Sequence, residues 1–138
     1  MNLLRRTLFA MLLGLNLSAA AEHPEDVSII RLVATPEQFD GRLVRVIGYF
    51  RAEFEGDSIY LHRQDYLQGI TKNGLWVDLE GVKRSTVNQA NQGYVLLEGV
   101  FRANDHGHLG LWSGSIDRVQ RLERWSRPEA PPVKLRPR

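Results

Sequence analysis

Residues 44–62 read VRVIGYFRAEFEGDSIYLH and predict a β-hairpin. Apolar and polar residues alternate from Val44, and the apolar run then continues past Gly48 to Phe50. A glycine inside a strand often marks a bulge or a sharp bend. The acidic turn Glu-Gly-Asp at residues 55–57 reverses the chain, and the alternation resumes at Ser58. This stretch therefore predicts two antiparallel strands, the first of them bent.

Three further segments have the pattern of strands, because their residues alternate or are apolar throughout. They are residues 75–79 (LWVDL), residues 94–101 (YVLLEGVF), and a fifth strand from His108 to about Leu122 with a kink near Gly114. The polar segment 81–93 between the third and fourth strands predicts one or two helical turns. Residues 27–33 (VSIIRLV) predict a short helix at the base of the sheet.

Three strands, a short helix and two strands is the order of the OB fold, a mainly β, five-stranded Greek-key barrel. Gly48 and Gly99 interrupt the first and fourth strands, as the curvature of a small barrel requires. The alternative is an open antiparallel sheet of the same strands. Eight apolar residues hold in-phase positions and are predicted to face inward. They are Val44, Val46, Ile59, Leu61, Leu75, Val77, Val95 and Leu97.

The segment ATPEQFDGRLVRVIG, residues 34–48, resembles the opening of small exported bacterial proteins with an OB-like fold and no assigned function. In that group a Pro-Glu-x-aromatic-Asp-Gly segment leads into a V-x-V-x-G strand. Residues 60–62 (YLH) and 107–114 (GHLGLWSG) look similar as well. The resemblance covers most of residues 27–122. It implies an OB-like barrel and supplies no catalytic residues.

Residues 1–21, MNLLRRTLFAMLLGLNLSAAA, have the three parts of a secretory signal peptide: arginines, an apolar stretch and small residues. Cleavage after Ala20 or Ala21 would leave a periplasmic or secreted protein. The apolar part is shorter than the roughly 20 residues of a membrane-spanning helix, so we expect no transmembrane segment after signal removal. An uncleaved membrane anchor is the alternative. The chain then divides into the signal peptide, a barrel domain (residues 22–125) and a Pro-rich basic tail (residues 126–138) expected to be disordered.

Charge is distributed unevenly between the barrel domain and the tail. Residues 22–125 hold 12 basic and 15 acidic side chains, whereas residues 126–138 hold four and one. OB barrels bind oligonucleotides or oligosaccharides, but nucleic acids require a basic groove. The acidic domain therefore favours a peptide, glycan or protein partner over a nucleic acid. The candidate ligand contacts are Tyr60, His62, Trp76 and Trp112. The alternative is that Tyr60 and Trp76 only cover the barrel.

Two predicted loops should lie beside each other, because in an OB barrel the loops after strands one and four flank the ligand face. Their carboxylates and imidazoles could hold a divalent cation or a basic segment of a partner. The alternative is that these residues are charged because loops are solvated. The candidate metal ligands are Glu53, Glu55, Asp57, Asp105, His106 and His108.

Signals for catalysis are sparse in this sequence. It contains no nucleophile elbow, phosphate loop, HExxH motif or cysteine. His62 with Asp65 is a possible acid/base pair, although both lie in a polar loop region. The sequence therefore predicts an exported, non-catalytic binding or accessory protein of the bacterial periplasm without a cofactor. The alternatives are a metal-dependent protein with its site at the barrel mouth and an oligonucleotide-binding OB domain. The ligand and the oligomeric state are not determined by the sequence.

Overall fold

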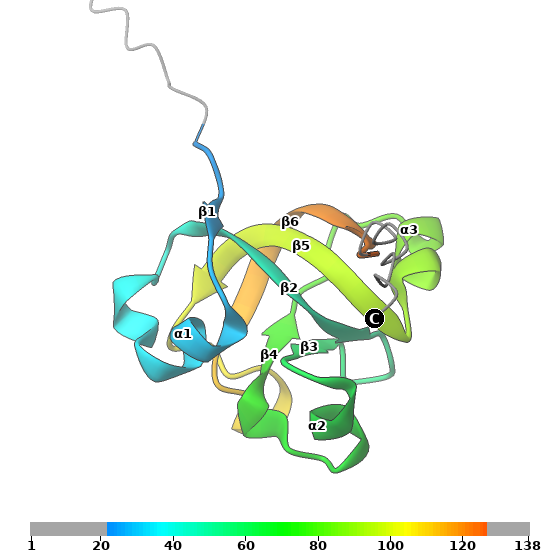
Figure 1. Ribbon diagram of the computed structural model, residues 1–138, viewed down its shortest axis with the longest axis horizontal. Coiled ribbons are helices and arrows are strands. Elements are labelled where there is room, and N and C mark those ends of the chain that lie inside the picture. The colour runs from blue at the N-terminus through cyan, green and yellow to red at the C-terminus, as the bar shows by residue number, and fades with distance from the viewer. Residues whose placement is uncertain (1–21, 127–138) are drawn as a thin grey trace, which may run out of the picture.

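The computed structural model describes residues 22–126 (Figure 1). The predicted signal peptide and residues 127–138 of the tail lie outside the described residues. The strands are β1 (Glu25–Asp26), β2 (Leu43–Arg51), β3 (Ser58–Tyr60), β4 (Gly74–Val77), β5 (Gly93–Arg102) and β6 (Ser115–Arg124). The α-helices are α1 (Ile29–Ala34), α2 (Arg63–Leu67) and α3 (Arg84–Ala90), and short 3₁₀ turns occupy Pro36–Gln38, Thr71–Asn73 and His108–Gly110.

Strands β2 to β6 close into a barrel, in the order β2-β3-β4-β6-β5 with β5 returning to β2. Pairing between β2 and β5 runs from Leu43 opposite Val100 to Phe50 opposite Gly93. Strands β4 and β6 are parallel, and the other barrel pairs are antiparallel. This closed, mainly β barrel is consistent with the predicted OB-like fold, and the continuous β2–β5 pairing excludes the open sheet.

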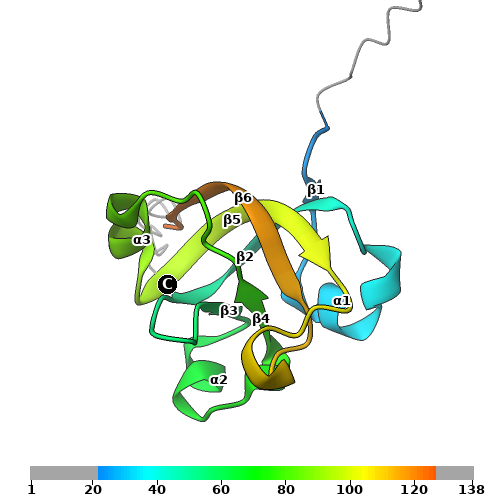
Figure 2. The same cartoon turned by 180° about the vertical axis from the view of Figure 1, so that it is seen from behind.

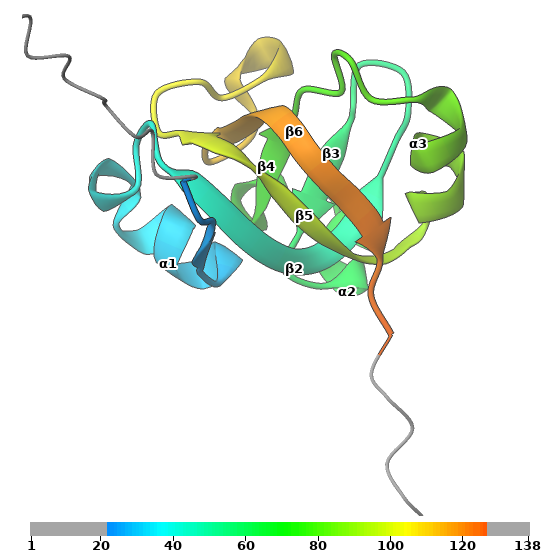
Figure 3. The same ribbon diagram turned by 90° about the horizontal axis from the view of Figure 1, so that it is seen from above.

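The barrel interior is formed by the residues that the alternating pattern selects. Seven of the eight residues predicted to face inward are fully buried, and the eighth, Leu61, is partly buried against the same core just after β3. Helix α1 adds the buried side chains of Ile29 and Leu32. Helices α1 and α3 lie at opposite ends of the barrel when it is viewed from the front, from behind and from above (Figures 1, 2 and 3).

Two parts of the chain differ from the sequence prediction. The fifth strand, β6, begins at Ser115 instead of His108. Left-handed backbone conformations at Gly107, Leu109 and Gly110 fold the preceding residues into a turn, which alternation alone does not reveal. The polar segment after β3 contains α2, a five-residue helix too short to produce a helical period.

Gly48 and Gly99 occupy the bends that the sequence predicts. A Cβ atom at Gly48 would lie 2.6 Å from the backbone oxygen of Tyr60 on the neighbouring strand. At Gly99 it would lie 2.5 Å from Cγ2 of Ile116, where the β5–β6 register shifts. Only a residue without a side chain allows the strands to approach this closely.

We expect Leu97→Ala to lower the free energy of unfolding by about 2–5 kcal/mol, because it leaves a cavity at a fully buried position. The matched control is Leu67→Ala on α2, whose side chain is exposed, and which should change stability by less than about 0.5 kcal/mol. Denaturant titration measures both. Equal losses for the two variants would show that β5 does not face the core as described.

We expect Gly48→Ala to cost about 1–3 kcal/mol, because the added methyl group meets backbone and core atoms that cannot move away independently. Gly56→Ala is the control, since its methyl group would meet only the flexible side chain of Glu53. Thermal and denaturant unfolding compare the two. A Gly48→Ala variant as stable as Gly56→Ala would contradict the close approach of β2 to β3.

Candidate functional site

Two loops meet at one side of the barrel. The first mouth loop (residues 52–57) joins β2 to β3, and the second mouth loop (residues 103–114) joins β5 to β6. Nε2 of His108 lies 3.3 Å from Oε2 of Glu55, so the loops are neighbours as the sequence predicts. Figure 3 shows both loops at the upper edge of the barrel, with α3 beside the first. We call the two loops together the mouth.

The second mouth loop is fixed by one carboxylate. Oδ2 of Asp105 accepts a hydrogen bond from the hydroxyl of Ser115 at 2.7 Å. Oδ1 accepts one from the backbone N–H of Gly107 at 3.1 Å. Ser115 is fully buried at the start of β6. Asp105 therefore ties the loop to the barrel wall with one oxygen and fixes a turn within the loop with the other.

Two tryptophans form the base of the same loop. Trp76 and Trp112 pack edge to face with ring centroids 5.0 Å apart. Gly107 lies so close to Trp76 that a Cβ atom would be 2.6 Å from the indole. Nδ1 of His106 lies 3.1 Å from the backbone oxygen of Trp112. The backbone of the loop is thus shaped by packing on aromatic rings as well as by Asp105.

The first mouth loop is held by its own acidic residues. Asp57 accepts the backbone N–H of Glu53 at 3.0 Å. The carboxylate of Glu53 accepts hydrogen bonds from Arg51 at 3.0 Å and from the hydroxyl of Tyr66 at 3.0 Å. Burial raises the pKa of Asp57, the hydrogen bond from Glu53 lowers it, and the nearby charges of Glu53 and Asp78 raise it further. Asp57 therefore sits in a region of negative potential.

The six predicted metal ligands do not converge on one point. Glu55 and His108 are brought together, but Glu53 is engaged by Arg51, and Asp105 by Ser115. Across residues 22–126, no three His, Asp or Glu side chains are grouped closely enough to hold a metal ion. What the mouth loops share is negative charge.

The four predicted ligand contacts are mostly packing residues. Tyr60 and Trp112 are each only 4% exposed, and Trp76 is partly buried beneath the second mouth loop. Tyr60 lies edge to face with Tyr66 of α2 at 5.7 Å. His62 is exposed at the start of α2. Tyr60 and Trp112 thus pack against the barrel, and for Tyr60 this is the alternative that the sequence leaves open.

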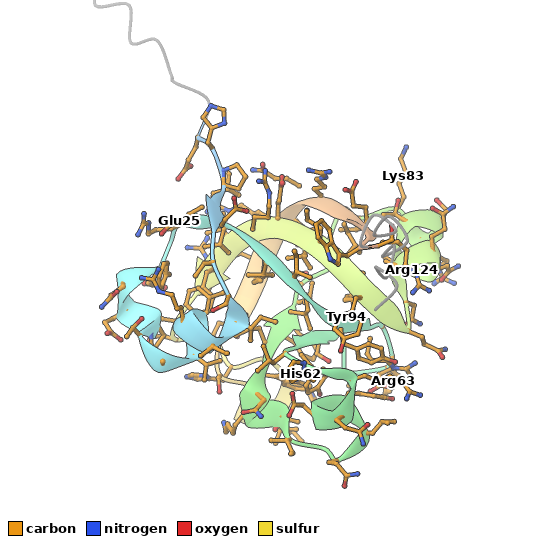
Figure 4. The ribbon with its side chains drawn as sticks, in the orientation of Figure 1. Glu25, His62, Arg63, Lys83, Tyr94 and Arg124 are labelled. Carbon is orange, nitrogen blue, oxygen red and sulfur yellow. The ribbon has the colours of Figure 1, made fainter. Side chains whose placement is uncertain are left out.

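Asp65 has a structural use that the sequence did not reveal. One of its oxygens accepts the backbone N–H of His62 at 3.0 Å, and the other accepts the amide of Asn73 at 2.9 Å. It therefore caps α2 and fixes the turn before β4. Beside it, the hydroxyl of Tyr94 accepts the backbone N–H of Arg63 at 3.3 Å (Figure 4). These contacts seat α2 on the outside of the barrel.

A tyrosine cluster under α2 was not predicted. The ring of Tyr49 lies 5.9 Å from that of Tyr66 and 5.8 Å from that of Tyr94, and the guanidinium of Arg51 lies 4.7 Å above Tyr66. Tyr49 and Tyr94 are cross-strand partners. Their register becomes visible only once the barrel is closed, so the sequence offered no signal for the cluster.

The two most exposed apolar residues at the mouth were also missed. Phe54 in the first mouth loop is 91% exposed, and Leu109 in the second is 79% exposed. They are next in sequence to Glu55 and His108, the pair that joins the loops. The sequence did contain a signal: the phenylalanine stands between two glutamates, and the leucine stands between His108 and Gly110. An apolar residue in such a polar turn is not expected to reach the core.

A cleft of about 350 Å³ separates the first mouth loop from α3. We call it the α3 cleft. Asn91, at the end of α3, holds the first mouth loop beside the helix. Its side chain accepts the N–H of Ala52 at 2.9 Å and donates to the carbonyl of Ala52 at 3.1 Å. The lining residues are Ala52, Glu53, Asp57, Leu79, Val82, Arg84, Val87 and Asn88.

No protein-family model matches the chain, and a search of curated proteins finds no significant match. Within residues 22–126, none of the helices has the length and apolar character needed to cross a membrane.

We expect Asp57→Asn to gain stability relative to the wild type as the pH rises. The substitution keeps an acceptor for Glu53 and removes a charge that burial disfavours. Because the pKa of Asp57 is raised in the folded state, the wild type loses stability as the pH rises through that pKa, and the variant does not. Denaturant titrations from about pH 3.5 to 7 measure the difference. A difference that does not change with pH would contradict this account of Asp57.

Proposed function

We propose that this chain is an exported, non-catalytic binding protein of the bacterial periplasm that holds a polypeptide partner at the mouth. The signal-peptide pattern of residues 1–21 supports export. The observation that carries the binding proposal is the pair of exposed apolar side chains, Phe54 and Leu109, on neighbouring loops.

Single exposed apolar residues are common on protein surfaces and need no explanation. Phe54 and Leu109 differ because contact between Glu55 and His108 places their loops together. Their exposure leaves apolar area in water that a partner could cover, and aromatic anchors of this kind dominate the energy of many interfaces. The second mouth loop is already fixed by Asp105, so binding would not have to order it.

The charge of the mouth selects the class of partner. The two loops carry Glu53, Glu55, Asp57 and Asp105 and contain no lysine or arginine. The cations that contact them are Arg51, paired with Glu53, and Lys72, which donates to the backbone of the second mouth loop. A nucleic acid would be repelled, and a neutral glycan carries no positive charge to match the carboxylates. A polypeptide segment that combines basic and apolar side chains complements both features, and such complementarity also speeds association.

Short synthetic peptides that combine Lys or Arg with Leu or Phe are the probes for this proposal. We expect Phe54→Ser/Leu109→Ser to weaken their binding to the mature protein at least about tenfold, which corresponds to ~1.4 kcal/mol. Calorimetry or fluorescence anisotropy measures the affinity. Peptides with Glu in place of the basic residues should bind more weakly to the wild type.

The control is Ile30→Ser on α1, which removes an exposed apolar side chain at another part of the barrel. It should leave peptide affinity unchanged. Equal binding by the wild type and the mouth double variant, or no preference for basic peptides, would refute the proposal.

A further inference from the structure

A second exposed apolar surface lies where β5 begins and β6 ends. Tyr94 is 40% exposed and Trp125 is 44% exposed. The N–H of Trp125 donates to the backbone oxygen of Tyr94 at 2.9 Å, so the two residues are neighbours across the strand pair. Cross-strand neighbours lie on the same face of a sheet. The two aromatic side chains thus leave apolar area in water at one edge of the barrel.

Two arginines flank this aromatic pair. The hydroxyl of Tyr94 accepts the N–H of Arg63 at 3.3 Å, which places the first turn of α2 beside the tyrosine. The guanidinium of Arg124 lies against Gly93 and donates to a backbone oxygen of α3 at 2.9 Å. Figure 4 shows Arg63, Tyr94 and Arg124 on one side of the barrel. We call Arg63, Tyr94, Arg124 and Trp125 the arginine–aromatic patch.

Both arginines of the patch lack an acidic partner. Within residues 22–126, neither of them forms an ion pair with a carboxylate. The acidic residues closest to them in sequence are already engaged, because Glu123 pairs with Arg121 and the buried Asp65 caps α2. Residues 81–97, which include Tyr94, contain no Asp or Glu. The patch is therefore a positively charged region of an otherwise acidic domain.

The mouth has the opposite charge. Its loops contain four acidic residues, one of them paired with Arg51, and no lysine or arginine. Its most exposed apolar side chains are Phe54 and Leu109. The patch offers positive charge together with Trp, Tyr and Arg, the residue types that dominate the energy of many protein interfaces. Because opposite charge on two surfaces favours their association, the mouth and the patch complement each other.

The mouth and the patch lie at different edges of the barrel. In Figure 3 the two mouth loops are at the upper edge, whereas the described chain leaves the end of β6 at the opposite edge. A contact between them therefore joins two molecules, with a different surface used on each. Such a contact leaves a free mouth on one molecule and a free patch on the other, so further copies add in the same way and form rings or open chains.

We propose that the arginine–aromatic patch binds the mouth of a second copy of this chain. The inference rests on the proposed function in one respect, that the mouth is a binding surface, and it names a partner that the chain itself supplies. Each surface offers two well-exposed apolar side chains, so the contact is small, weak and reversible. It occupies the mouth at high protein concentration and gives way to a partner that binds more tightly. Added salt weakens it, because the charges are exposed to solvent.

Two variants that each remove one surface test the contact in the full mature chain. Phe54→Ser/Leu109→Ser alters the mouth, and Arg63→Glu/Trp125→Ser alters the patch. All four side chains are exposed, and the backbone hydrogen bonds of Arg63 and Trp125 are kept. Sedimentation velocity over a range of protein concentrations measures association. We expect the wild type to associate and each variant alone to do so at least about tenfold more weakly.

Mixing the two variants shows whether the surfaces on the two molecules differ. Each variant keeps the surface that the other has lost, so the mixture should form a complex of one molecule of each, with an affinity close to that of the wild type. The control Ile30→Ser should associate as the wild type does. A monomeric wild type, a patch variant that associates as strongly as the wild type, or a mixture that forms no complex would each overturn the proposal.

The peptide measurements separate this inference from the proposed function. Binding of basic peptides to the wild type, without association of the mixed variants, would refute the inference and leave the proposed function intact. A complex of the mixed variants, without binding of the synthetic peptides, would refute the peptide proposal and leave the contact between copies. Where both hold, the peptides should dissociate the mixed complex, because they occupy the same mouth.

Discussion

Closure of the barrel depends on β2, the strand that pairs with β5 along its length and with β3 at its end. This double pairing requires β2 to bend, and the bend is possible because Gly48 brings no side chain between β2 and the backbone of Tyr60. Gly99 serves the same purpose in β5, where the register with β6 shifts. Both mouth loops extend from the ends of strands that Gly48 and Gly99 allow to curve. The two close approaches therefore determine where the loops lie.

This dependence explains how much the sequence could predict. Alternation identified the inward-facing residues, and glycines inside apolar runs identified the bends, because both reflect local geometry. The start of β6 was misplaced since Leu109 and Leu111 continue an apolar alternation through a left-handed turn. The loops were correctly placed beside each other, but the directions of their side chains were not predictable. Asp105 turns to Ser115 at the start of β6 and Glu53 to Tyr66 of α2, and neither contact follows from a local sequence pattern.

The mouth combines a rigid backbone with side chains that are free to meet a partner. The hydrogen bonds of Asp105 and the packing of Gly107 on Trp76 fix the second loop from below. By contrast, the contact between Glu55 and His108 is exposed, and exposed pairs of this kind contribute little to stability. The loops are therefore positioned by buried groups. Phe54 and Leu109 add nothing to the core, which is why their exposure is more consistent with binding than with folding.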